Sequence, residues 1–188
     1  MSGQFWWYLA RSGGIVAWIL LASSVALGLL QAGKLIGRAS GRSWVADTHQ
    51  FLGSLATVFV GVHLLALVAD SYVYFGWSEI LVPFASDWKP GPVAIGIVGF
   101  WLLVAIEITS LAKRHLPRTL WRTVHHLSLP LFVVATVHGF LAGTDTSAPL
   151  YVGAAAACLL ALFVLALRRV VEQRSRSANY GVRHASNL

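Results

Sequence analysis

Five long apolar runs constrain the fold of this chain more than any other feature. They lie at about residues 15–35, 49–69, 93–112, 120–142 and 150–167 of the 188-residue sequence. An α-helix needs about 20 apolar residues to cross the bilayer core, so each run is long enough for a tilted crossing. Lipid offers the backbone no hydrogen-bond partners, and runs of this length therefore cross as helices. The sequence predicts an all-α membrane protein with five transmembrane helices.

The composition agrees with a location in the bilayer. Hydrophobic residues make up 57% of the chain and charged residues only 11%, whereas soluble domains carry about 25% charged residues. So few charges exclude a soluble globular protein, and so many apolar residues exclude a disordered chain. We expect a multi-pass membrane protein surrounded by the lipid bilayer.

Basic residues indicate which way the helices cross. All but two of the 14 Lys and Arg residues lie in the first connection, the third connection and the C-terminal segment, and the two exceptions are Arg11 and Lys89. Because basic loops stay in the cytoplasm, the N-terminus is expected outside and the C-terminus inside. The same asymmetry accounts for the net charge of +7, so no nucleic-acid partner is expected.

The longest connection, residues 71–92, is aromatic and apolar rather than polar. Such a composition is typical of a segment that lies at the level of the lipid headgroups. We expect an outer interfacial segment here, either a short helix or a re-entrant turn, between the second and third transmembrane helices.

Histidines are the unusual polar residues of the apolar runs. His49 and His63 stand fourteen residues apart in the second run, and His125 and His138 stand thirteen apart in the fourth. An ionisable residue inside a membrane is costly unless it has a partner. A single such histidine is more often a hydrogen bonder between helices, but two widely spaced pairs point to a common function.

The two helices run in the same direction, because one antiparallel helix separates them. Thirteen or fourteen residues span roughly 20 Å of helix, so His49 comes level with His125 and His63 with His138. Two facing imidazoles are suitable axial ligands for a heme iron, and the pattern predicts two non-covalent b-type hemes stacked across the membrane. Gly53, one turn after His49, would leave room for the flat macrocycle.

One spacing does not fit an ideal helix. At 100° per residue, a step of thirteen residues misses the starting direction by about 140°. Pro130 lies between His125 and His138, and a kink at this proline would bring the two rings onto one face.

The histidine-bearing helices and the start of the first helix resemble a known family. The second run reads HQFLGSLATVFVGVH from residue 49, the fourth reads LWRTVHHLSLPLFVVATVH from residue 120, and residues 9–13 read LARSG. All three resemble the ferric reductase-like transmembrane domain superfamily. This superfamily includes ferric reductases, NADPH oxidases and the heme-binding membrane subunit of the bacterial methionine sulfoxide reductase system.

The resemblance covers roughly residues 5–170 and implies a heme-binding transmembrane domain there. Residues 171–188 would form a short basic cytoplasmic tail, and the bacterial cytoplasmic membrane is the expected location. The resemblance also implies a ligand set: His49 and His125 would bind the inner heme iron, and His63 and His138 the outer heme iron.

The implied function is that of a diheme cytochrome b, the electron-transport part of an oxidoreductase. The sequence contains no Gly-rich phosphate loop, so flavin and NAD(P)H chemistry would come from a flavoprotein partner, or electrons would pass to or from a quinone. Two other functions stay open: a quinone-coupled diheme enzyme of the superoxide oxidase type, and a non-catalytic membrane scaffold subunit. Histidine-based metal transport is weaker, because the second and fourth runs lack acidic residues.

Other polar residues near the expected hemes have candidate roles. Arg122 on the inner side and Arg11 on the outer side are placed to bind anionic heme propionates, although Arg122 also fits a plain orientation signal. His126 competes with His125, which is preferred because Trp121 precedes it by four residues, as in the bacterial relatives. Glu107 is the acid well inside a run, where it could pair with Arg114, serve a proton path or extend to the interface.

Overall fold

The computed structural model describes residues 3–32, 39–71, 73–144 and 148–185, and in these residues helices joined by turns and loops make up the fold, with no strand. Five of its helical segments are long and apolar enough to cross a membrane, which confirms the predicted all-α fold with five transmembrane helices. The elements are α1 (Gly3–Ala32), α2 (Ala39–Ala69), α3 (Trp77–Leu81), α4 (Pro90–Leu111), α5 (Arg118–His126), α6 (Ser128–Ala142) and α7 (Pro149–Ala185).

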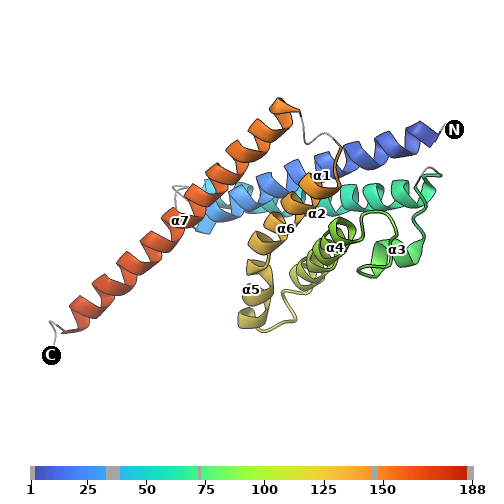
Figure 1. Ribbon diagram of the computed structural model, residues 1–188. Helices are drawn as coiled ribbons and strands as arrows, with labels where there is room; N and C mark the ends of the chain where they lie inside the picture. The colour runs from blue at the N-terminus through green and yellow to red at the C-terminus, as the bar shows by residue number, and fades with distance from the viewer. Residues whose placement is uncertain (1–2, 33–38, 72, 145–147, 186–188) are drawn as a thin grey trace.

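Two helix pairs, together with the short helix α5, form the bundle that holds the histidines (Figure 1). Helices α1 and α2 lie side by side along most of their length, and α4 packs against α6. Contacts of α1 with α6 and of α2 with α4 join the two pairs. Three groups of buried apolar side chains fill the contacts, centred on Phe132, Phe75 and Leu103.

Helix α7 packs on the side of this bundle. It crosses α1, where Cys158 and Leu162 pack with Trp18, Ala22 and Val25, and its far end extends beyond the other helices (Figure 1). The helix does not end with its apolar run near residue 167 but continues to Ala185. The basic segment expected to form a tail is therefore helical as far as Ala185.

The fourth transmembrane segment is interrupted, as its proline suggests. Helix α5 ends at His126 and α6 begins at Ser128, with Leu127 between them at φ −66° and ψ −7°. A ψ near zero departs from the helical value of about −42°. Pro130 lies in the first turn of α6, where its missing N–H costs no hydrogen bond, while its ring would clash with the carbonyl of His126 in a continuous helix. The break changes the direction in which His125 and His138 project.

The connection between α2 and α4, which the sequence predicts to be an outer interfacial segment, is folded and contains the short helix α3. Phe75 and Ile80 are buried against α2 and α4. The indole of Trp101 donates to the carbonyl of Leu81 at 3.0 Å, and the Lys89 ammonium donates to the carbonyls of Leu141 and Ala142 at 3.2 and 3.5 Å. These bonds attach the connection to α4 and to the end of α6.

Candidate functional site

The four histidines of the expected ligand set come together as two facing pairs. The ring centroids of His49 and His125 lie 5.8 Å apart with an interplanar angle of 84°, and those of His63 and His138 lie 6.5 Å apart at 79°. Helix α2 supplies one member of each pair, while α5 supplies His125 and α6 supplies His138. The pairs stand at two levels of the bundle, as the spacing of the residues predicts.

Three of these imidazoles are anchored to main-chain carbonyls of a neighbouring helix. The Nδ1 atoms lie 2.7 Å from the Ala10 oxygen for His63, 2.8 Å from the Pro92 oxygen for His138 and 2.8 Å from the Ser24 oxygen for His49. A carbonyl can only accept, so Nδ1 carries the proton and a neutral ring leaves the lone pair of Nε2 unused. This is the arrangement in which a histidine binds a metal through Nε2 while its other nitrogen is held in place.

A glycine accompanies each of these three carbonyls, four residues further along the same helix. A Cβ atom at Gly96 would lie 2.5 Å from Cε1 of His138, one at Gly14 would lie 3.2 Å from Nδ1 of His63, and one at Gly28 would lie 3.3 Å from Cε1 of His49. The missing side chains leave the space that the rings occupy. Sequence reasoning did not find these glycines, because their role appears only when the facing helix is known.

His125 is held differently from the other three. Its Nδ1 lies 3.5 Å from the hydroxyl of Ser110, and Trp121 stacks on its ring at 5.3 Å and 25°. The Nε1 of Trp121 is buried without a hydrogen-bond partner in the described part of the chain. His126 is exposed, so the structure turns His125, and not His126, toward His49.

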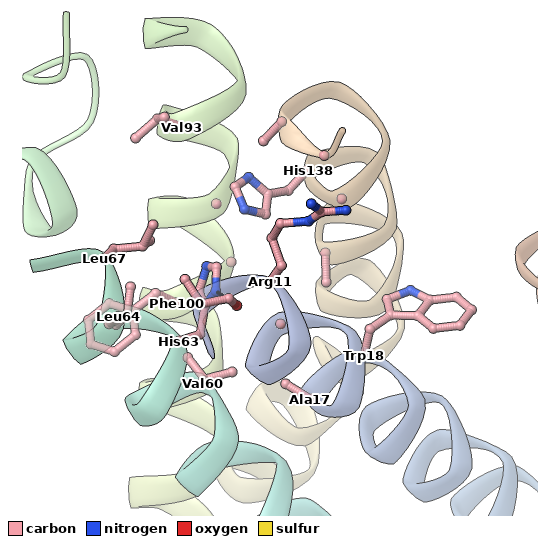
Figure 2. A pocket seen from close by; sticks show the side chains of 18 of the residues that line it. Arg11, Ala17, Trp18, Val60, His63, Leu64, Leu67, Val93, Phe100 and His138 are labelled. Atoms are coloured by element: carbon pink, nitrogen blue, oxygen red, sulfur yellow. Dashed lines mark hydrogen bonds between the residues drawn. The ribbon is translucent and has the colours of Figure 1, made fainter. Parts of the chain in front are cut away.

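A cavity of about 250 Å³ surrounds the outer pair, His63 and His138 (Figure 2). It extends from Leu21 and Leu131 to Arg11 and Trp88 at the end nearer the N-terminus of α1, and most of its wall is apolar. One water molecule needs only about 10–15 Å³ by this kind of measure. The space is therefore large enough for a sizeable apolar group rather than a few waters.

The donor set fits a heme better than a bare metal ion. With metal–nitrogen bonds of about 2.0–2.1 Å, two imidazoles on opposite sides of one metal have ring centroids roughly 6.4 Å apart, close to the 5.8 and 6.5 Å of the two pairs. A heme iron takes just such axial ligands from the protein. Among the described residues, no group of three or more His, Cys, Asp or Glu is arranged to hold a metal ion.

The three other predicted site residues lie at different places. Arg11 lines the outer cavity and extends from α1 toward His138 (Figure 2). Arg122 is exposed on α5, three residues before His125. Gly53 faces neither histidine ring, because a Cβ there would lie 3.3 Å from Oε1 of Glu107 and 3.7 Å from Oγ of Ser24.

Comparison with known proteins finds one protein family that matches most of the bundle. The family described as "Ferric reductase like transmembrane component" matches residues 13–136. No curated protein and no solved structure matches the chain significantly. The matched range contains Gly14, Gly28, His49, His63, Gly96 and His125, and it ends two residues before His138.

Proposed function

This chain belongs to the ferric reductase-like transmembrane family, whose members are membrane oxidoreductase components that generally bind heme, and from that membership we propose that it is a diheme b-type cytochrome. It moves single electrons across the membrane as the membrane part of a ferric reductase-like oxidoreductase. The observation that carries the proposal is the pair of facing imidazole sites, 5.8 and 6.5 Å between ring centroids, with Nδ1 of three rings bound to carbonyls.

The side chains of the bundle would hold each heme and exclude water from it. His49 and His125 would bind the inner iron, and His63 and His138 the outer iron. The carbonyls of α1 and α4 fix the orientation of three of these rings, so little ordering remains when the iron binds. A heme iron supplies reversible one-electron chemistry, which the apolar wall of the cavity protects from water.

Polar residues at the two ends of the bundle are placed to bind the propionate groups at the edges of the hemes. Arg11 reaches the outer cavity, where a heme propionate would offer it a charge-assisted hydrogen bond. On the inner side, Arg122 is exposed and the Trp121 indole N–H is buried without a partner, and a propionate would accept from both. Gly53 contributes indirectly, by leaving space beside Ser24, whose carbonyl and hydroxyl both contact His49.

The electron donor or acceptor is a separate molecule in this proposal. A flavoprotein with its own nucleotide site, or a quinone in the bilayer, would exchange electrons with one of the hemes. The exposed basic residues of the connection between α4 and α5, among them Lys113 and Arg114, suit an acidic protein surface at the inner end. By the distribution of basic residues, this end faces the cytoplasm of a bacterial cell.

A heme count on purified protein tests the proposal. The dithionite-reduced minus oxidised spectrum of the wild type should show b-type absorption equivalent to two hemes per chain. His63→Ala and His138→Ala should each lower the count to about one, because each removes one axial ligand of the outer iron. His115→Ala, at an exposed histidine, is the control and should keep both hemes. A colourless wild type, or four histidines that all tolerate glutamine, would contradict the proposal and favour a scaffold subunit.

A further inference from the structure

Glu107 is an acid inside the bundle that the proposed heme sites do not use. It lies half-buried on α4, one turn before Ser110, the residue whose hydroxyl faces His125. Within the described residues, no ion pair joins it to Arg114 and its carboxyl has no hydrogen-bond partner. A carboxyl placed inside a membrane bundle without a partner is costly, and such residues usually have a function.

The side chains around Glu107 place its carboxyl near the inner histidine pair. Glu107 Oε1 and Ser24 Oγ approach the same point from α4 and α1, 3.3 and 3.7 Å from where a Cβ of Gly53 would lie. Gly53 on α2 leaves that point empty of side chain. Three helices thus bring the Glu107 carboxyl and the Ser24 hydroxyl close together one turn from His49.

Ser24 connects these two polar groups to the inner histidine pair. The Ser24 hydroxyl lies 3.0 Å from Nδ1 of His49 and donates to the His49 carbonyl at 3.2 Å, while the Ser24 carbonyl accepts from the same Nδ1 at 2.8 Å. A change of charge at the inner site is therefore felt at Glu107 across the Ser24 hydroxyl, in surroundings of low dielectric.

We propose that Glu107 takes up one proton when the inner heme site gains an electron. This inference rests on the proposed function. One electron enters from the donor, and one proton from the water at the inner face forms an O–H bond on the Glu107 carboxylate. When the electron moves on to the outer site, that bond breaks and the proton leaves. The proton neutralises the Glu107 carboxylate, whose negative charge would otherwise repel the added electron.

Few other charged groups face Glu107 from the helices packed around it. Helix α2 brings His49 and α5 brings His125, both assigned to the heme site. Helix α1 has Arg11 at its outer end as its charged residue, and the titratable residue of α6 is His138, in the outer pair. Lys113, Arg114 and Arg122 are exposed and are screened by water and salt. Asp47 on α2, two residues before His49, is exposed, so Glu107 is the acid inside the described bundle that is positioned to exchange a proton at this level.

A redox titration of the heme-loaded protein at pH 6, 7 and 8 tests this inference. The wild type should show two midpoint potentials, one of which falls as the pH rises, by at most about 59 mV per unit for one proton per electron. Glu107→Gln should remove this slope from that heme and leave the other heme unchanged. Glu107→Asp should restore part of the slope.

Two glycine variants separate proton exchange from a merely structural role. Gly53→Ala adds a methyl 3.3 Å from Oε1 of Glu107 without changing any ionisable group, and the protein that retains the inner heme should show a smaller slope. Gly61→Ala on the same helix has open space around the added methyl and should behave as the wild type. Two bound hemes with an unchanged slope in Glu107→Gln, or no slope in the wild type, would overturn this inference alone. Protein without heme would overturn the proposed function and this inference with it.

Discussion

At the scale of single residues, the groups that hold each imidazole in place matter as much for the site as the imidazoles themselves. The rings of His49, His63 and His138 each rest where a glycine has no side chain, with Nδ1 on a carbonyl four residues earlier in that helix. Such contacts cannot be read from the histidine-bearing helices themselves. They explain how a buried polar ring meets its hydrogen-bonding need and still presents Nε2 to the centre of the pair.

Alanine at these glycines should displace the rings in the order of the contacts that it creates. Gly96→Ala, whose Cβ would lie 2.5 Å from the His138 ring, should lose most of one heme. Gly14→Ala and Gly28→Ala, with contacts of 3.2 and 3.3 Å, should lose less. Heme per chain from the reduced spectrum measures the order. Gly61→Ala is the control on α2, and equal retention by all four variants would contradict the assigned role of the glycines.

At the scale of secondary-structure elements, the break between α5 and α6 decides whether the fourth transmembrane segment can serve both pairs. A continuous helix would turn its two histidines about 140° apart over thirteen residues. The interruption at Leu127 removes this conflict. Pro130 is its cause in the sequence, since its ring excludes the carbonyl of His126 from a regular turn.

Replacing Pro130 should therefore affect the inner pair more than the outer pair. In Pro130→Ala the N–H of residue 130 can bond to the carbonyl of His126, and straightening of α5 onto α6 would rotate His125 away from His49. We expect a partial loss of one heme, with the outer heme retained because α6 keeps its contacts with α4. Heme stoichiometry and the redox titration together show which heme is lost. Pro149→Ala, at the first residue of α7, is the control, and preferential loss of the outer heme would contradict this explanation.

At the scale of the whole molecule, the bundle of α1, α2, α4, α5 and α6 carries the four histidines and the groups that hold them, and α7 is attached to its side. The contacts of α7 with α1 involve residues up to Ala166, and the remaining turns extend away from the bundle (Figure 1). None of the four histidines depends on α7 for its hydrogen bond. The boundary proposed at residue 170 thus separates the predicted heme domain from a helical extension.

A chain that ends at residue 170 should keep both hemes. It retains the α7 residues that pack on α1, together with the basic pair Arg168 and Arg169 that helps to orient the helix. The heme count and the two midpoint potentials should equal those of the full chain. The extension can affect only the rate at which a protein donor delivers electrons. Loss of either heme on this truncation would contradict the boundary.

Much of the molecule is determined by local sequence pattern. The five apolar runs predict the five helices because lipid forces backbone groups to bond within each segment. The spacing of the histidines places two on each of two parallel helices, and Pro130 indicates the break. These inferences depend only on helix geometry and on distances along the chain.

Tertiary structure decided what lies across from each residue. It showed His125 rather than His126 facing His49, glycines of α1 and α4 beside the rings, and Gly53 beside Glu107 instead of a histidine. It also showed α7 continuing to Ala185 as a helix. The physical reason is that hydropathy specifies that a helix is in the membrane, but not the rotation about its axis or its neighbours. Packing between helices sets both, and the chemistry of this site lies in those contacts.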